Sequence, residues 1–220
     1  MNAELIINIC ILTASLFGFL YGVKKTFLAR APLYARMITG ALACMMLSRL
    51  SYVIREAAGL YFPRGFHVSI LGCIGIFLFL LTANMGVMDG IADDGSAAYA
   101  KYRITALTAP AVIALLYLPV LFSEQPMAYK ISCAAVSAAA AYSSYYNFKH
   151  VIFPDVDFGI IKSIRSYNLA AFGLAILHMA EMIAICYEWN ILLVISGLLL
   201  AADSVAILPL LLRGIRRWTV

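Results

Sequence analysis

Charged residues are scarce in this sequence. They make up 12% of its 220 residues, whereas soluble domains carry roughly 25%. Hydrophobic residues make up 64%, and apolar stretches recur that approach the length of about 20 residues that a helix needs to cross a bilayer. Seven such stretches with short connections account for the whole length, so the composition excludes a soluble domain of any size.

The signatures of several chemistries are also missing. The chain has no GxSxG, HExxH, P-loop or CxxCH motif. Its three histidines, His67, His150 and His178, fall on an outer loop, an inner loop and a buried face, so they cannot share one metal. The last apolar stretch has no lysine for a retinal Schiff base. We therefore expect no metal and no cofactor.

Cysteine usage points the same way. The chain has five cysteines, an odd number, without CxxC spacing and all inside apolar stretches. This pattern is typical neither of a disulfide framework nor of a zinc site. We expect reduced, buried thiols that act as small core residues.

The apolar stretches predict an all-α integral membrane protein, a single bundle of seven transmembrane helices over residues 1–220. Pro110 lies inside the fourth span, where we expect a kink. The fifth span consists almost entirely of small residues, which let helices approach closely, so we expect it near the centre of the bundle. The expected spans are approximately residues 4–21, 33–57, 68–88, 104–122, 127–148, 166–188 and 190–212.

Lysine and arginine are unevenly divided between the two expected sides. With the amino terminus outside, the inner loops hold twelve basic residues, and the outer side holds only Arg55, Arg64 and Lys130. Short cytoplasmic loops carry the excess of positive charge. The sequence therefore predicts an outside amino terminus and a cytoplasmic carboxyl terminus, in a membrane such as the bacterial cytoplasmic membrane. The basic residues flank spans and form no patch, so the net charge of +5 does not indicate nucleic-acid binding.

A weak internal similarity relates the first and fifth spans. The segment FLYGVKKTFL aligns with SYYNFKHVIF, which places Tyr21 on Tyr146 and Lys24 on Lys149. The second and sixth spans then each carry a charged residue in the outer half. Two parallel three-helix repeats joined by an extra helix are one known transporter plan. A 3+1+3 arrangement is therefore a hypothesis for this chain.

Polar and charged residues lie inside the expected spans, where ionisable groups are costly and usually mark a functional site. His178 and Glu181 are three residues apart and share a helix face. Arg49 and Glu181 each lie roughly 22 Å from the inner side at 1.5 Å per residue, which predicts an ion pair with His178 beside it. A polar cavity that binds a small molecule would be lined by Arg49, His178, Glu181, Asp203 and Asn84. The alternative is that these residues only tie helices together.

The acidic segment MDGIADDGS follows the third span and has two interpretations. Asp89, Asp93 and Asp94, with Asp155 and Asp157 on the same side, could offer oxygen ligands to a divalent cation. The favoured interpretation is a solvated capping loop, in which the aspartates bond to their own backbone.

Three functions remain open from the sequence. The leading hypothesis is binding or transport of a small molecule, with Arg49 and Glu181 as gate or substrate contacts. The second is a sensory or accessory subunit that docks a membrane protein partner. The third is an enzyme acting on a lipid, with His178 and Glu181 as an acid–base pair. The lipid bilayer surrounds the chain in each case, and Tyr145, Tyr146 and Tyr167 are expected to be interface anchors.

Overall fold

The computed structural model describes residues 3–59, 67–85, 89–154 and 160–218, which are almost entirely helical and contain no strand. The helices are α1 (Ala3–Gly22), α2 (Leu33–Ala57), α3 (Val68–Ala83), α4 (Asp89–Ala92), α5 (Ala100–Ala106), α6 (Thr108–Phe122), α7 (Met127–Ile152), α8 (Ile160–Tyr187) and α9 (Asn190–Trp218). A π-helical turn, Val23–Phe27, extends α1, and a 3-10 turn, Ala97–Tyr99, precedes α5.

Five helical stretches are long and apolar enough to cross a membrane. They are Ala3–Phe27, Leu33–Ala57, Ala97–Phe122, Lys162–Tyr187 and Asn190–Ile215. Helix α3 is apolar but has only 16 residues. Helix α7 has 26 residues but is rich in serine and tyrosine, which lowers its hydropathy. The five stretches indicate an integral membrane protein.

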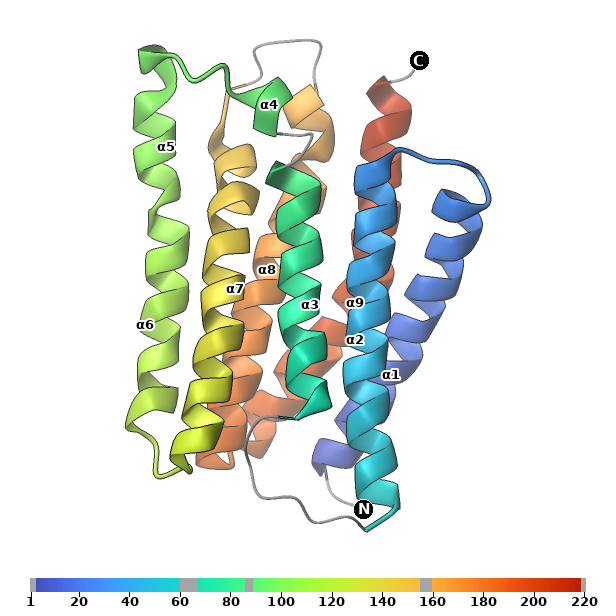
Figure 1. Ribbon diagram of the computed structural model, residues 1–220, viewed down its shortest axis with the longest axis vertical. Coiled ribbons are helices and arrows are strands. Elements are labelled where there is room, and N and C mark those ends of the chain that lie inside the picture. Colours follow the sequence, from blue (N-terminus) through green and yellow to red (C-terminus); the bar gives the residue numbers. More distant parts are fainter. Residues whose placement is uncertain (1–2, 60–66, 86–88, 155–159, 219–220) are drawn as a thin grey trace.

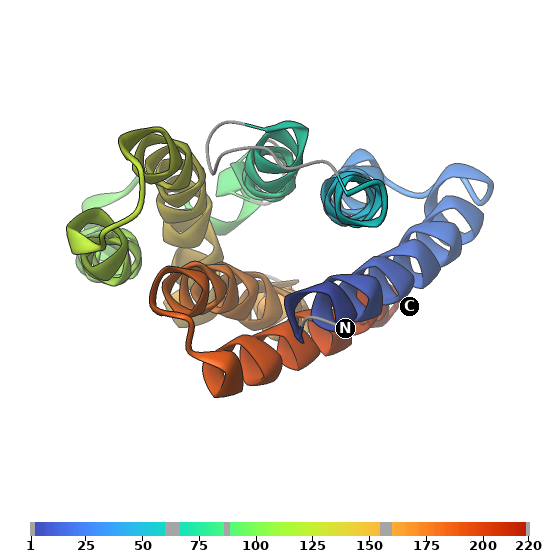
Figure 2. The same cartoon turned by 90° about the horizontal axis from the view of Figure 1, so that it is seen from below.

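The long helices run alternately up and down, with the amino terminus at the lower end and the carboxyl terminus at the upper end (Figure 1). Helices α1, α2, α3, α7, α8 and α9 form a closed ring in that order, with α9 packed against α1 (Figure 2). Helix α6 lies outside the ring against α7 and α8. Helix α7 thus packs against α3, α6 and α8, which agrees with the central position expected for the span of small residues.

The fourth expected span is divided at Leu107 into α5 and α6. The physical reason is Pro110: it has no N–H to donate to the carbonyl of Ala106, four residues earlier, so the regular helical bonding stops there. The helical stretch also begins earlier than expected, at Ala97. The predicted kink near Pro110 is confirmed.

Close helix approach depends on glycines in the ring. A Cβ on Gly18 of α1 would lie 2.6 Å from the carbonyl oxygen of Ser204 on α9, and one on Gly214 of α9 would lie 2.5 Å from the carbonyl oxygen of Ser163 on α8. Both contacts are with backbone, which cannot move aside as a side chain can. The five cysteines, all within the described ranges, form no disulfide.

Candidate functional site

The predicted ion pair between Arg49 and Glu181 is present. Arg49 Nη1 donates to Glu181 Oε1 at 2.5 Å and Nη2 donates to Oε2 at 2.6 Å. Nη1 also donates to Asn8 Oδ1 on α1 at 2.8 Å. Arg49, Glu181 and Asn8 are 7%, 4% and 3% exposed. A two-pronged, water-excluded guanidinium–carboxylate contact is the strongest geometry such a pair can adopt.

The pair spans the interior of the ring. Arg49 lies on α2 and Glu181 on α8, and these helices are not neighbours in the ring order. Both residues lie near the lower end of the bundle in Figure 1, Arg49 eight residues before the end of α2 and Glu181 six before the end of α8. The pair therefore joins α2 and α8 across the ring in its lower part. Asn8, which binds Arg49 from α1, was missed from the sequence because a single asparagine in an apolar span gives no signal of its partner.

His178 lies one helical turn from Glu181 but does not bond to it. Its Nδ1 lies 3.0 Å from the carbonyl oxygen of Leu174, so Nδ1–H donates to that oxygen. Nε2 has no hydrogen-bond partner among the described residues, and the ring packs edge-on against Phe77 with centroids 5.3 Å apart. Because Arg49 occupies both carboxylate oxygens of Glu181, the acid–base pair needed for a lipid-directed enzyme has no geometric support.

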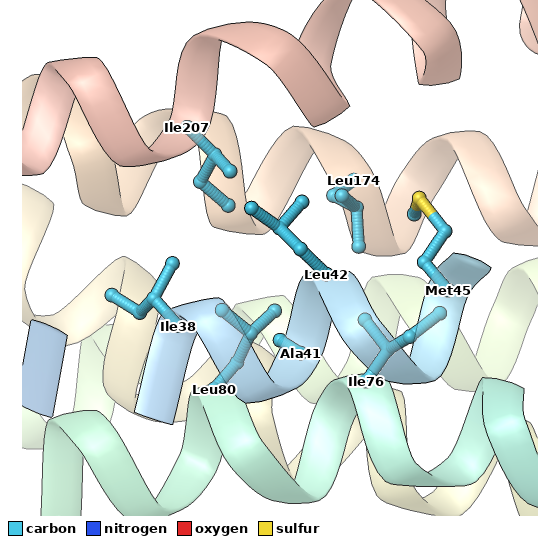
Figure 3. Close-up of a pocket in the computed structure, with 8 residues that line it drawn as sticks. All are labelled: Ile38, Ala41, Leu42, Met45, Ile76, Leu80, Leu174 and Ile207. Atoms are coloured by element: carbon cyan, nitrogen blue, oxygen red, sulfur yellow. The ribbon is translucent and has the colours of Figure 1, made fainter. Parts of the chain in front are cut away.

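The ring interior above the pair is apolar. Met45, one turn along α2 from Arg49, is one of the residues around a cavity of about 10 Å³, which is room for about one water molecule. Figure 3 shows the side chains converging on it from α2, α3, α8 and α9: Ile38, Ala41, Leu42, Met45, Ile76, Leu80, Leu174 and Ile207. The residues expected to share one polar cavity do not line this one.

Asn84 and Asp203 lie apart from the ion pair. Asn84, fully buried at the upper end of α3, donates through its amide to Asn147 Oδ1 on α7, and Asn147 donates to Ser143 Oγ at 3.2 Å. Asp203 lies in the middle of α9, half-buried, and its Oδ2 has no hydrogen-bond partner within the described ranges. The five expected site residues thus divide into the Arg49–Glu181 pair with His178, an upper amide contact and a separate carboxyl.

Tyr167 is not an interface anchor, contrary to expectation. It is 0% exposed, and its hydroxyl lies beside Asn84. The reason is rotation: Tyr167 shares a face of α8 with Leu174 and His178, which point into the bundle. Tyr145 and Tyr146 are half-buried.

A second charged network lies at the upper end of the bundle, and it was not predicted from the sequence. Lys149 is 3% exposed, and its Nζ lies 2.5 Å from Asp89 Oδ1 and 2.8 Å from Asp93 Oδ2. Asp93 also binds Arg103 at 2.7 Å, and His150 Nε2 lies 3.3 Å from Asp89. The connection after α3 is thereby held on the end of α7. We call Lys149, Asp89, Asp93, Arg103 and His150 the upper network.

The upper network shifts the titration of its members. Burial raises the pKa of Asp89, but hydrogen bonds from His150 and Lys149 outweigh it and lower the pKa below its usual value. The same balance lowers the pKa of Asp93, through Lys149, the Gly95 amide and Arg103. Burial lowers the pKa of Lys149, but the two aspartates outweigh it and raise the pKa. Each charged form is therefore stabilised in the folded protein.

The acidic segment is a capping loop, as expected, but it is not fully solvated. Asp93 Oδ1 accepts from the Gly95 amide at 3.0 Å, and Asp94 Oδ1 accepts from the Ser96 amide at 2.8 Å. Asp89 and Asp93 also form ion pairs with the buried Lys149, which was not expected. In the part of the chain that the structure describes, no group of three or more His, Cys, Asp or Glu side chains could hold a metal. Asp155 and Asp157 lie outside the described residues.

Comparison with known proteins identifies no relative of this chain. No family model, no curated protein and no solved structure matches it.

Proposed function

We propose that the chain crosses the membrane seven times, with its amino terminus outside and its carboxyl terminus in the cytoplasm, in a bacterial cytoplasmic membrane. The spans are the five long apolar stretches together with α3 and α7. The up-and-down course of the helices supports this, because it carries the chain across at each long helix (Figure 1). The excess of lysine and arginine at one end sets the orientation.

We further propose that α1–α3 and α7–α9 are two parallel three-helix units, with α5 and α6 as the connecting span. The ring order is α1, α2, α3, α7, α8, α9. If α1, α2 and α3 take the places of α7, α8 and α9, and the reverse, each helix still has equivalent neighbours. Leu42 and Arg49 are seven residues apart on α2, as are Leu174 and Glu181 on α8. Leu42 and Leu174 line the same small cavity, and Arg49 and Glu181 bind each other. Equivalent positions of the two units thus face each other, as a two-fold relation requires.

The function we propose is binding, and transport, of a small molecule within the ring, with Arg49–Glu181 as the gate at the outer end. The observation that carries it is a buried, two-pronged ion pair that joins the two units across the ring interior. Opening that end would free both charges for a solute with its own carboxylate or cationic group, which could replace one partner. Between the two ends, the described residues surround a small apolar cavity of about 10 Å³.

Native mass spectrometry of the gently purified protein tests this proposal. The wild type should retain a small molecule in stoichiometric amount. The double variant Arg49→Met, Glu181→Leu should lose it, because it offers neither a cation to a carboxylate nor a carboxylate to a cationic solute. Arg55→Ala is the matched control: it removes a partly exposed arginine six residues further along α2, and it should retain the molecule.

The identified molecule would then be offered to the protein reconstituted in liposomes. Uptake by the wild type and Arg55→Ala, with none by the double variant Arg49→Met, Glu181→Leu, supports transport. Binding without uptake would leave a sensory role and refute transport. Retention of lipid or of a partner protein alone, with no small molecule, would refute the proposal.

A further inference from the structure

Asp203 is an ionisable residue inside a span, and it belongs neither to the Arg49–Glu181 pair nor to the upper network. It lies 13 residues from the start of α9 and 15 from its end, which is about 20 Å from each at 1.5 Å per residue. In the proposed topology this is the middle of the bilayer. A carboxyl group at that depth is costly unless it is paired or neutral.

Asp203 is not paired. Its side chain forms no hydrogen bond or ion pair with the part of the chain that the structure describes, and its Oδ2 is fully buried. The neighbouring Ser204 hydroxyl is directed elsewhere, to the carbonyl oxygen of Leu200 at 2.6 Å and to Met45 Sδ at 2.8 Å. Glu181, which is buried inside the ring, is held by Arg49 through both oxygens. The two acids therefore have opposite environments.

The position of Asp203 on α9 places it near the α8–α9 contact. Gly214, three turns further along the same face, packs against the backbone of Ser163 and Ile164 on α8. The ionisable groups on the elements packed against α9 are engaged or buried elsewhere: His178 donates to Leu174, Arg49 binds Glu181, and Tyr167 lies beside Asn84. The remaining ones are Glu4, Cys10 and Tyr21 on α1, Lys162, Arg165, Cys186 and Tyr187 on α8, and Tyr34, Arg36, Cys44, Tyr52, Arg55 and Glu56 on α2.

We propose that Asp203 is a proton-binding site: it is protonated in this conformation and exchanges its proton with water when the ring opens. The argument is electrostatic. An ionised carboxylate with no cation and no donor in hydrocarbon is far less stable than the neutral acid. The proposal builds on the proposed function, to which it adds protons as the coupling ion, because a carboxyl that is neutral inside and ionised in water can carry a proton across.

Labelling with dicyclohexylcarbodiimide tests the site directly, because this apolar reagent adds to protonated carboxyl groups in hydrophobic surroundings. Purified protein in detergent would be treated at pH 5 to 9, digested, and analysed by mass spectrometry. We expect one adduct in the membrane-spanning peptides, on Asp203, that falls at least fivefold as the pH rises through this range. Asp203→Glu should be labelled and Asp203→Asn should not, while Glu181 should stay unmodified because Arg49 holds it.

Three results would overturn the proposal: no adduct on Asp203, an adduct that does not change with pH, or equal labelling of Glu181. Asp203→Glu keeps the test informative if Asp203→Asn does not fold. The labelling needs no solute and no transport, so its failure is distinguishable from failure of the proposed function. If a solute is bound but Asp203 is not labelled, the binding site stands and proton coupling is wrong.

Discussion

Removing Arg49 should destabilise the protein more than removing the whole ion pair. In Arg49→Met, Glu181 would remain as a buried carboxylate without a cation, and Asn8 would lose the donor to its Oδ1. Breaking one partner of a buried pair costs about 3–5 kcal/mol, whereas replacing both partners by apolar groups is often neutral. For a chain of this size, each kcal/mol corresponds to roughly 2–4 °C in Tm. We therefore expect Arg49→Met to lower the Tm by about 6–20 °C.

The double variant Arg49→Met, Glu181→Leu should recover most of that loss. Met45, one turn from Arg49, and Leu174, two turns from Glu181, belong to the lining of the apolar cavity, so the two new side chains would add to an existing apolar cluster. The assay is thermal unfolding in detergent of the wild type, both single variants and the double variant, with Arg55→Met as the control for a lost arginine. If the effects of the two single variants simply add in the double variant, the coupling energy is zero and the assigned role of the pair is refuted.

Three further predictions address the upper network, the helix packing and the topology. Because the pKa of Asp89 and of Asp93 is lowered in the folded protein, these groups stabilise the fold above the unfolded pKa of about 3.9, and the contribution is lost as the pH falls through the folded pKa. Because the pKa of Lys149 is raised, this group stabilises the fold below the unfolded pKa of about 10.4, and its contribution is lost as the pH rises through the folded pKa. The contribution of this network to the Tm should therefore be constant between these limits. Lys149→Met should lower the Tm there, whereas an unchanged Tm would contradict the network. Gly214→Ala should lower the Tm, because the new Cβ would meet the carbonyl oxygen of Ser163. Gly173→Ala is the control: its Cβ would have nothing within 4 Å, so this change should raise the free energy of unfolding by about 0.5–1 kcal/mol. Equal effects of the two changes would show that the α8–α9 contact does not depend on Gly214. A cysteine replacing the exposed Glu124 should react with a membrane-impermeant maleimide on intact cells, and one replacing the exposed Lys101 only after permeabilisation; the reverse pattern would invert the proposed orientation.

The sequence predicted the ion pair because depth in a membrane helix follows from residue count. Arg49 and Glu181 lie at similar distances from the same side, and hydrocarbon leaves a charged group few alternatives to an opposite charge. Helix rotation was harder to predict. Tyr167 and Lys149 were expected at the inner surface, yet both are buried. Lys149 is paired with Asp89, which comes from another segment, and Tyr167 is turned into the bundle by the rotation of α8.

The expected polar cavity could not be judged from sequence for a related reason. Which residues line the interior depends on how α2, α3, α8 and α9 are rotated against one another. Leu42, Ile76, Leu174 and Ile207 fill the space that the polar residues were expected to share. These apolar side chains are unremarkable within apolar spans, so the sequence pattern contains no signal that distinguishes the lining of an interior from a surface that faces lipid.

The Arg49–Glu181 pair and the upper network each connect the two proposed three-helix units. Arg49 of the first three-helix unit binds Glu181 of the second, at the lower end of the ring. At the upper end, Lys149 of the second unit binds Asp89 and Asp93, which lie on the connection leaving the first. The two ionic contacts therefore join the units at opposite ends.

A tilt of one unit against the other would separate one ionic contact while the other acts as a hinge. Separating an ion pair loses its charge-assisted hydrogen bonds, so opening both ends together would cost more than opening one end. A solute that replaces one partner at the open end would offset the cost of opening that end alone. In the proposed transport function, ionic contacts at opposite ends would therefore favour the opening of one end at a time.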